Sequence, residues 1–450
     1  MPRLFGTDGV RGLANKKLTP ELATNLGIAA ARLFSESAQT KNGQKPRAVV
    51  GRDTRISGEF LDHAIVAGLA SAGMDVDRAR VVTTPTVAFL TAEGDYDLGV
   101  MISASHNPMP DNGIKFFARG GFKLPDTVED KIEAILGEEW ERPLGGDVGE
   151  VEEESKAVDR SYIDHLVSAV GTDLSGLRIA VDCANGAASF LGPEALREAG
   201  ADAVVINASP DGRNINYECG STHPEALHAA VVSQHCDFGV AYDGDADRCL
   251  AVDAEGNLVD GDKIMGMLAV GLKEEGKLAG NTLVVTVMSN LGLLLAMKEV
   301  GIDTVQTAVG DRYVLEKMRE GGFAIGGEQS GHVIISDYAT TGDGVLTSLM
   351  IAKRVKQTGK SLAELTDFVK RLPQTLINVP NVDKAAASSN EAVAKSVMQA
   401  EDYLGENGRV LLRPSGTEPV VRVMVEAATQ EESDRVCKEL ASVVKEELSL

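Results

Sequence analysis

The chain has 450 residues, of which 43% are hydrophobic and 25% are charged, a composition typical of globular proteins with sizeable cores and not of disordered chains. This length exceeds what one hydrophobic core usually covers, so three or four domains are expected. The formal net charge of -23 repels polyanions, so we expect neither nucleic acid nor an anionic membrane as a partner.

The cysteines and the first residues favour a cytoplasmic location. Five cysteines, an odd number without CxxC spacing, argue against a disulfide framework or a zinc site. The N-terminal sequence MPRLFGTDGVRG has no apolar signal core, and the most apolar stretch, LVVTVMSNLGLLLAM, is interrupted by Ser289 and Asn290. We therefore expect neither export nor a membrane span.

Three consecutive segments predict one order of elements, in which strands alternate with amphipathic helices and the last strand runs into a polar loop. In the first segment, strands are expected over 47–53 and 79–82, a helix over 59–73, and a final strand with its loop over 97–108. The corresponding elements of the second and third segments are 177–186, 193–201, 203–208, 224–235 and 237–248, then 281–290, 292–301, 304–309, 313–322 and 323–332.

This alternation predicts an α/β fold of three tandem βαβ-type domains with mixed, mostly parallel sheets, which bind ligands beyond the carboxyl ends of their strands. A fourth segment, with two strands over 408–427 and a helix over 431–448, predicts a C-terminal α+β domain. The acidic stretch near 137–156 has the Gly, Pro and charge content of a linker. The expected domains are 1–156, 157–255, 256–370 and 371–450.

Three aspartates in AYDGDADRCL, namely Asp243, Asp245 and Asp247, recur at every second position on a turn after an apolar strand. Their carboxylates would repel one another unless a divalent cation neutralised them, and an all-oxygen ligand set favours Mg²⁺. A solvated acidic turn is the alternative. A calcium-sensor loop is excluded, because Arg248 and Ala254 stand where that loop needs Gly and Glu.

The segment RPSGTEPVVR suits a phosphate monoester. Arg413 supplies a guanidinium fork, Ser415 and Thr417 supply hydroxyls, and Gly416 lets backbone amides approach an anion closely. A plain β-turn between two strands is the alternative. Arg422, a second guanidinium in the same segment, favours the phosphate interpretation.

The segment GGEQSGH places Glu328, Ser330 and His332 at alternate positions. In an extended loop these side chains would point the same way and could hydrogen-bond sugar hydroxyls. A glycine-flanked polar turn with a structural histidine is the alternative interpretation of the same residues.

Ser105, in VMISASHNPMPDNGIKFF, follows an apolar strand. A serine hydrolase would need a general base within hydrogen-bond reach, but no nucleophile elbow is present, and the side chain of the adjacent His106 would diverge. A phosphorylated serine fits better. Its oxygen would complete the Mg²⁺ shell of the three aspartates, while Lys115 and Arg11 balance the dianion.

In this order, SASHNP, DGDADR, GEQSGH and RPSGTEP resemble the phosphoserine, metal, sugar-binding and phosphate loops of the α-D-phosphohexomutases, and the resemblance covers essentially the whole chain. FGTDGVRG at 5–12, CGSTHPE at 219–225 and GDRYV at 310–314 are similar to the branch of that family that acts on glucosamine phosphates. One departure is Ser103, where many members have Thr.

The resemblance implies a four-domain molecule with one loop per domain facing a central cleft and a mobile fourth domain. By family correspondence Ser105 carries the phosphoryl group and, with Asp243, Asp245 and Asp247, ligates one Mg²⁺. The implied substrate contacts are Glu328, Ser330, Arg413, Ser415, Gly416, Thr417 and Arg422, and the residues implied at the reacting centre are Arg11, His106, Lys115, Arg248 and His332.

The implied reaction interconverts glucosamine 6-phosphate and glucosamine 1-phosphate through glucosamine 1,6-bisphosphate, and feeds UDP-N-acetylglucosamine and cell-wall precursor synthesis. The expected partner is a small-molecule sugar phosphate, and the expected assembly is a monomer or homodimer. Three alternatives stay open: a phosphomannomutase or phosphoglucomutase, a noncatalytic sugar-phosphate sensor, and a metal-dependent phosphatase.

Overall fold

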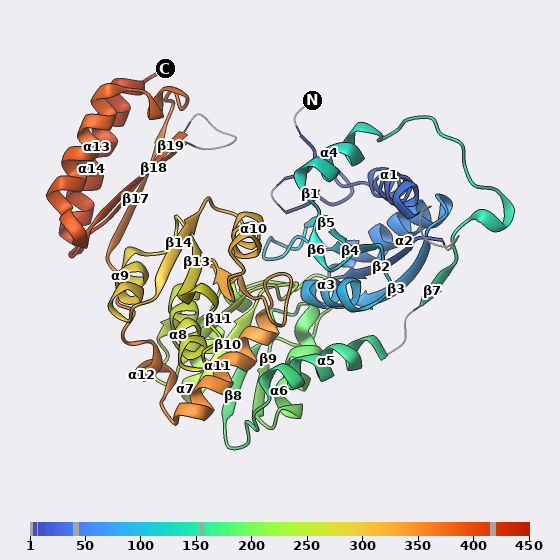
Figure 1. The fold of residues 1–450 in the computed structure, drawn as a ribbon, viewed down its shortest axis with the longest axis horizontal. Helices are drawn as coiled ribbons and strands as arrows, with labels where there is room; N and C mark the ends of the chain where they lie inside the picture. The colour runs from blue at the N-terminus through green and yellow to red at the C-terminus, as the bar shows by residue number, and fades with distance from the viewer. Residues whose placement is uncertain (1–2, 7, 39–44, 154–156, 415–419) are drawn as a thin grey trace. The chain divides into compact units, whose positions relative to one another are not determined.

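A computed structural model of the chain describes residues 3–6, 8–38, 45–153, 157–414 and 420–450 (Figure 1). These residues belong to two compact units. One contains 1–288 and 302–367, and the other contains 289–301 and 368–450. Within the described ranges, no helix is both long enough and apolar enough to cross a membrane.

The first sheet has the strand order β1-β5-β4-β2-β3-β7, with β6 paired to β5. Strands β4, β2, β3 and β7 pair in parallel, whereas β5 is antiparallel to β1, β4 and β6. The strands are β1 (Val10–Leu13), β2 (Arg47–Arg52), β3 (Asp75–Val81), β4 (Leu98–Ile102), β5 (Asp111–Ala118), β6 (Phe122–Lys123) and β7 (Val151–Glu153), and the helices around them are α1 (Pro20–Ala38), α2 (Ile56–Ser71), α3 (Thr84–Glu93) and α4 (Asp126–Ala134).

Side chains alternate across this sheet and build a core on each face, as expected for a sheet covered by helices on both sides. Val50 and Val100 pack in the cluster that contains the apolar residues of α1 and α2. Their neighbours Val49 and Met101 pack in a second cluster with Val87 of α3. The helices on the two faces therefore fix the position of the ends of β2 and β4.

The second and third sheets repeat this plan, with the strand orders β12-β11-β10-β8-β9 and β14-β13-β15-β16. In each, helices connect three parallel strands, and the last of these continues through a turn into an antiparallel strand. The elements are α5 (Ala157–Val170), β8 (Arg178–Asp182), α6 (Leu191–Glu198), β9 (Asp202–Ile206), α7 (Glu225–Ser233), β10 (Phe238–Tyr242), β11 (Cys249–Asp253), β12 (Leu258–Val259), α8 (Gly261–Glu274), β13 (Thr282–Thr286), α9 (Leu291–Glu299), β14 (Asp303–Thr307), α10 (Asp311–Gly321), β15 (Ile325–Gly327), β16 (Val333–Ile335), α11 (Gly344–Thr358) and α12 (Leu362–Thr366).

The predicted threefold repeat and the mixed α/β sheets are confirmed. The antiparallel return strand of each repeat was not predicted. It turns each of the three predicted loops into a hairpin turn, between β4 and β5, β10 and β11, and β15 and β16. Because each turn follows a parallel strand, its side chains lie at the carboxyl end of its sheet.

The stretch expected to be a linker, 137–156, contributes a strand to the first sheet. Within it, β7 runs parallel to β3 and covers an edge that would otherwise present unpaired backbone groups. The second sheet likewise takes in β12, which pairs with β11 beyond the end expected for that domain at residue 255.

The second unit contains an antiparallel sheet of order β17-β19-β18. Valines of β19 pack against apolar residues of α14 in its core. Strands β18 and β19 and helix α14 were expected from the sequence, whereas β17 and α13 were not. The elements are β17 (Gln374–Pro380), α13 (Glu391–Leu404), β18 (Arg409–Pro414), β19 (Val420–Glu426) and α14 (Gln430–Leu448).

Candidate active site

Ser105 lies in the turn between β4 and β5, with a left-handed backbone (φ 53°) and 1% exposure. Its hydroxyl donates a hydrogen bond to the carboxylate of Asp243, and its Oγ lies 3.3 Å from His106 Nδ1. Burial, together with the positive charges of Arg248 and Arg11, lowers the pKa of His106 to about 4. The imidazole beside Ser105 is therefore neutral near pH 7.

The shape of the Ser105 turn depends on Arg55, which is fully buried at the entrance to α2. Its Nη2 donates to the carbonyls of Ser105 (2.9 Å) and Asn107 (2.8 Å), and its Nη1 donates to the carbonyl of Pro108 (2.7 Å). One guanidinium thus satisfies three carbonyls of a single turn, which fixes the backbone around Ser105.

Asp53 and Asn216 complete this support. Asp53 Oδ2 accepts hydrogen bonds from Arg55 Nε (2.9 Å) and Ser103 Oγ (2.7 Å), and Ser103 Oγ accepts the amide N–H of Ser105 (2.9 Å). From the second domain, Asn216 Nδ2 donates to the carbonyl of Ser105 (2.8 Å). Residue 103 makes both of these hydrogen bonds through its hydroxyl, which Ser and Thr share, so Ser103 can replace the Thr of other family members without losing them.

Sequence reasoning missed Asp53, Arg55 and Asn216. A signal for the first two was present, because an aspartate and an arginine come directly after the buried strand β2, at the carboxyl edge where ligands bind. Nothing in the sequence around Asn216 points to a contact with a residue 111 positions away.

Asp243, Asp245 and Asp247 lie together in the turn between β10 and β11, as predicted. Their ligand atoms are within 4.8 Å of one another, and all three residues are buried. Burial and the charges of Asp247 and Asp245 raise the pKa of Asp243 to about 8. In the described part of the chain, Asp245 Oδ1 and Asp247 Oδ1 are buried without a hydrogen-bond partner. Repelling carboxylates and unsatisfied buried oxygens fit a divalent cation with oxygen ligands.

Lys115, on β5, is 1% exposed and connects the first domain to this cluster. Its Nζ lies 2.8 Å from Asp245 Oδ2, 3.4 Å from Asp247 Oδ2 and 3.1 Å from Asp8 Oδ2. Burial alone would lower the pKa of Lys115, but the surrounding carboxylates, led by Asp245, raise it. Thr84 Oγ1 also donates to Asp245 Oδ2 (2.6 Å), so the oxygen that Lys115 contacts is held from two sides.

Arg11 and Arg248 add positive charge at the same place. Arg11 forms an ion pair with Asp8, and Arg248 Nε lies 3.8 Å from Asp247 Oδ1. Among the described residues, Arg11 Nε and Arg248 Nε are buried without a hydrogen-bond acceptor. Two buried cationic donors without an acceptor fit the binding of an anion such as a phosphoryl group.

Glu328, Ser330 and His332 lie in the turn between β15 and β16. The expectation of an extended segment is wrong, because the amide of Gly331 donates to the carbonyl of Glu328 (3.0 Å) and the amide of Glu328 donates to the carbonyl of His332 (2.9 Å). The turn separates the three side chains: Ser330 is exposed, Glu328 is half-buried and His332 is 2% exposed.

His332 reaches the aspartate cluster. Its Nδ1 lies 3.8 Å from Asp247 Oδ1, and its Nε2 accepts the amide N–H of Gly342 (3.0 Å). Burial would lower the pKa of His332, but the contact with the Asp247 carboxylate outweighs it and raises this pKa. The structure thus brings residues of three repeats to one site: Ser105 and Lys115, the three aspartates, and His332.

Arg413 and Arg422 lie in the second unit, directly opposite one another on β18 and β19. Like charges at directly opposite positions destabilise a strand pair, so this arrangement fits a bound anion. Ser415, Gly416 and Thr417 lie outside the described residues.

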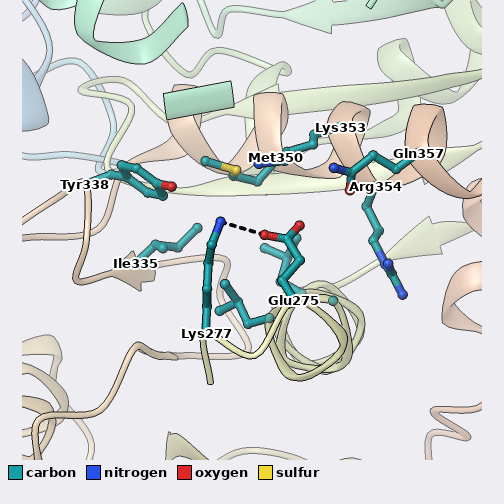
Figure 2. Close-up of a pocket in the computed structure, with 11 residues that line it drawn as sticks. Glu275, Lys277, Ile335, Tyr338, Met350, Lys353, Arg354 and Gln357 are labelled. Atoms are coloured by element: carbon teal, nitrogen blue, oxygen red, sulfur yellow. Dashed lines mark hydrogen bonds and ion pairs between the residues drawn. The ribbon is translucent and has the colours of Figure 1, made fainter. Parts of the chain in front are cut away.

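A separate small pocket lies between α8 and α11 (Figure 2). Figure 2 shows Lys277 and Glu275 pointing toward one another, with Nζ 2.8 Å from Oε2, beside the side chains of Tyr338 and Met350. The residues that line this pocket include no predicted site residue.

Comparison with known families gives four consecutive matches. They are phosphoglucomutase/phosphomannomutase alpha/beta/alpha domain I over residues 2–142, domain II over 160–256, domain III over 260–372 and the C-terminal domain over 376–443. The chain belongs to this family. It is similar to the phosphoglucosamine mutases of Bifidobacterium animalis subsp. lactis, at 61% identity, and of Nocardioides sp., at 60% identity, and each alignment covers 100% of both chains.

Solved structures share the fold. A phosphoglucomutase/phosphomannomutase family protein from Burkholderia thailandensis superposes with a TM-score of 0.82 at 23% identity, covering 100% of this chain and 99% of that chain. The N-acetylphosphoglucosamine mutase of Aspergillus fumigatus, solved with GlcNAc-6P and magnesium, superposes with a TM-score of 0.69 at 18% identity, covering 98% of this chain and 95% of that chain.

Proposed function

We propose that this chain is an isomerase that interconverts glucosamine 6-phosphate and glucosamine 1-phosphate by way of a phosphoserine at position 105. The full-length identity of about 60% to phosphoglucosamine mutases supports the substrate. The observation that carries the chemistry is the contact of the Ser105 hydroxyl with Asp243, inside the aspartate cluster.

The proposed reaction has two transfers that balance. In the first, the C1 hydroxyl of glucosamine 6-phosphate loses its proton and attacks the phosphorus on Ser105, the bond from phosphorus to Oγ breaks, and Oγ gains a proton, which gives glucosamine 1,6-bisphosphate and a free serine hydroxyl. The bisphosphate then turns end for end. In the second, the Ser105 hydroxyl loses its proton and its Oγ attacks the phosphorus on O6, the bond from phosphorus to O6 breaks, and O6 gains a proton, so glucosamine 1-phosphate leaves with a C6 hydroxyl. The serine is phosphorylated again, so the enzyme needs the bisphosphate only as an intermediate and activator.

The proposed Mg²⁺ ligands are the phosphorylated Ser105, Asp243, Asp245 and Asp247, which together provide only oxygen donors. A bound Mg²⁺ ion supplies electrostatic stabilisation of the negative charge on the transferring phosphoryl oxygens. The two unsatisfied aspartate oxygens are the observation that supports this assignment.

The charged side chains around Ser105 bind and orient the phosphoryl group. Lys115 and Arg248 offset its negative charge from within the site, and the unsatisfied Nε donors of Arg11 and Arg248 suit its oxygens. His106 and His332 line the same centre. In a site that excludes water, such prearranged charges stabilise a transition state more strongly than they would in bulk water.

Glu328 and Ser330 are proposed as contacts to sugar hydroxyls. The phosphate that is not transferred is assigned to Arg413, Ser415, Gly416, Thr417 and Arg422. The opposed pair of Arg413 and Arg422 on adjacent strands supports this assignment. The four domains are proposed to span 1–156, 157–255, 256–370 and 371–450, in keeping with the four family matches, except that the second sheet includes β12 beyond residue 255.

A substrate panel tests the function. With added bisphosphate activator, kcat/KM for glucosamine phosphate should exceed the values for glucose and mannose phosphates by at least about tenfold, which is about 1.4 kcal/mol of transition-state binding. Equal or better turnover of mannose 1-phosphate would instead make the chain a phosphomannomutase. Binding without turnover would indicate a sensor, and release of inorganic phosphate would indicate a phosphatase.

A further inference from the structure

Two segments, FGTDGVRG at 5–12 and GDRYV at 310–314, meet at the side chain of Lys123. Lys123, at the end of β6, forms ion pairs with Asp8 of the first segment and with Asp311 of the second. The three side chains are largely buried, with Lys123 at 7% exposure, Asp311 at 13% and Asp8 at 19%. Burial would lower the pKa of Lys123, but the charge of Asp311, followed by that of Asp8, raises it.

The two carboxylates are not equally neutralised. Asp8 contacts Arg11 and Lys115 as well as Lys123. Burial would raise the pKa of Asp8, but these three cations hold it well below its usual value. In the described chain, Asp311 Oδ2 forms an ion pair with Lys123, which it shares with Asp8, and lies 3.6 Å from His332 Nε2. Asp311 Oδ1 accepts the amide N–H of Arg312 (2.9 Å). Asp311 thus has fewer cationic partners than Asp8, which makes it the carboxylate of the two that is better suited to a further cation.

Asp311 also lies between the reacting centre and the predicted sugar contact. His332 Nε2 is 3.6 Å from Asp311 Oδ2, and its Nδ1 is 3.8 Å from Asp247 Oδ1. On the other side, the amide of Gly310, the residue before Asp311, donates to Glu328 Oε1 (3.1 Å). A hexose phosphate that contacts Glu328 and reacts at Ser105 therefore comes close to Asp311.

We propose that Asp311 accepts the 2-ammonium group of glucosamine phosphate and so selects an amino sugar over a plain hexose. This inference rests on the proposed function. An ammonium offers a carboxylate a charge-assisted hydrogen bond and neutralises its excess charge, whereas the 2-hydroxyl of glucose phosphate gives a weaker bond and leaves that charge in place. Lys123 holds the carboxylate in position and links α10 to β6.

The competing explanation is that Asp311 only fastens α10 to the first domain through Lys123. The two explanations differ in which substrates lose activity when Asp311 is changed. A fastening residue affects every hexose phosphate equally, whereas an ammonium-binding residue affects only the amino sugar. The selectivity ratio, defined as kcat/KM for glucosamine 6-phosphate divided by kcat/KM for glucose 6-phosphate, separates the two.

Asp311→Asn is the direct test, because it removes the charge and keeps the size. We expect the selectivity ratio to fall by about tenfold or more, with kcat/KM for glucose 6-phosphate kept within about threefold. Asp126→Asn is the matched control. It removes a carboxylate that pairs with Arg312, the next residue of α10, and should leave the ratio unchanged. An equal loss on both substrates in Asp311→Asn would overturn the proposal.

A second measurement needs no variant and holds even if Asp311→Asn folds poorly. In the unaltered protein, the selectivity ratio should fall as pH rises through the pKa of the substrate's amino group, because only the charged form gains the bond. A ratio that stays constant through that range would also overturn the proposal. If the unaltered protein prefers glucose or mannose phosphate at every pH, the proposed function fails instead, so the two failures are distinguishable.

Discussion

The hydroxyl of Ser105 donates a hydrogen bond to the carboxylate of Asp243, which lies 138 positions further along the chain. Both residues occupy turns that leave the last parallel strand of their sheets, β4 and β10. The same topology, repeated in two domains, thus provides the proposed phosphoryl carrier and the proposed metal ligands. The carrier role and the metal role can be tested separately.

Ser105→Ala should abolish the mutase reaction, with a loss of about a thousandfold or more, because the variant has no oxygen to carry the phosphoryl group. Intact mass spectrometry of the unaltered protein should find a fraction of molecules with one added phosphate, which is missing from the variant. Ser189→Ala, which removes a hydroxyl bonded to the Gly186 carbonyl, is the control and should keep both. Substantial activity of Ser105→Ala would refute the carrier role.

Removal of the metal should abolish activity reversibly, with full recovery on addition of Mg²⁺. Asp245→Asn should weaken this response, since it removes one of three converging charges. A readout independent of turnover is thermal unfolding of the unaltered protein without substrate, in which added Mg²⁺ should stabilise the fold by about 2.7 kcal/mol at a hundred times Kd. Asp237→Asn, at the other end of β10, where the carboxylate accepts the Arg178 amide at 2.7 Å, is the control. Activity that survives both chelation and Asp245→Asn would end the metal assignment.

The sequence was sufficient for the aspartate cluster, which lies in the turn after a predicted strand. Asp243, Asp245 and Asp247 were found because their spacing is local and their mutual repulsion is a chemical signal within a few residues. The strand before them is an apolar run, so the sequence shows where the strand ends and the turn begins. The presence of three consecutive α/β repeats could be predicted from the alternation of strands and helices along the chain.

The supporting residues could not be found in this way, because their contacts join distant segments. Arg55 binds the carbonyl of Ser105 across 50 positions, and Lys123 contacts Asp311 across 188. For Arg55 the one local signal was its place directly after a buried strand, whereas Lys123 has no local pattern that separates a buried support from an ordinary surface charge. The sharp turn at Glu328 was also missed, because alternate spacing alone does not reveal the hydrogen bonds that close a turn.

Two variants of Arg55 separate its effect on stability from its effect on the position of the Ser105 turn. Arg55→Ala leaves Asp53 buried without its partner and should destabilise the protein by about 3–5 kcal/mol. Arg55→Lys keeps the charge but cannot reach three carbonyls, so kcat should fall by about tenfold or more while KM changes by less than about threefold. Arg47→Lys is the control, because it makes the same substitution in the first domain at a residue of β2 that pairs with Asp77. Unaltered kcat in Arg55→Lys would show that the turn needs only one of these bonds.

A variant of Arg413 tests how the enzyme retains the bisphosphate intermediate. If Arg413 and Arg422 bind the phosphate that is not transferred, Arg413→Ala should raise KM by about 10- to 100-fold, because a hydrogen bond to a charged group contributes about 1.5–3 kcal/mol. The bisphosphate should also escape more often before it turns, so the variant should need more added glucosamine 1,6-bisphosphate for full activity. Arg435→Ala removes a guanidinium that pairs with Glu439 on α14 and should change neither quantity. Unaltered KM together with an unaltered requirement for bisphosphate would reduce this hairpin to a structural turn, while the claims for Ser105 and the aspartates would stand.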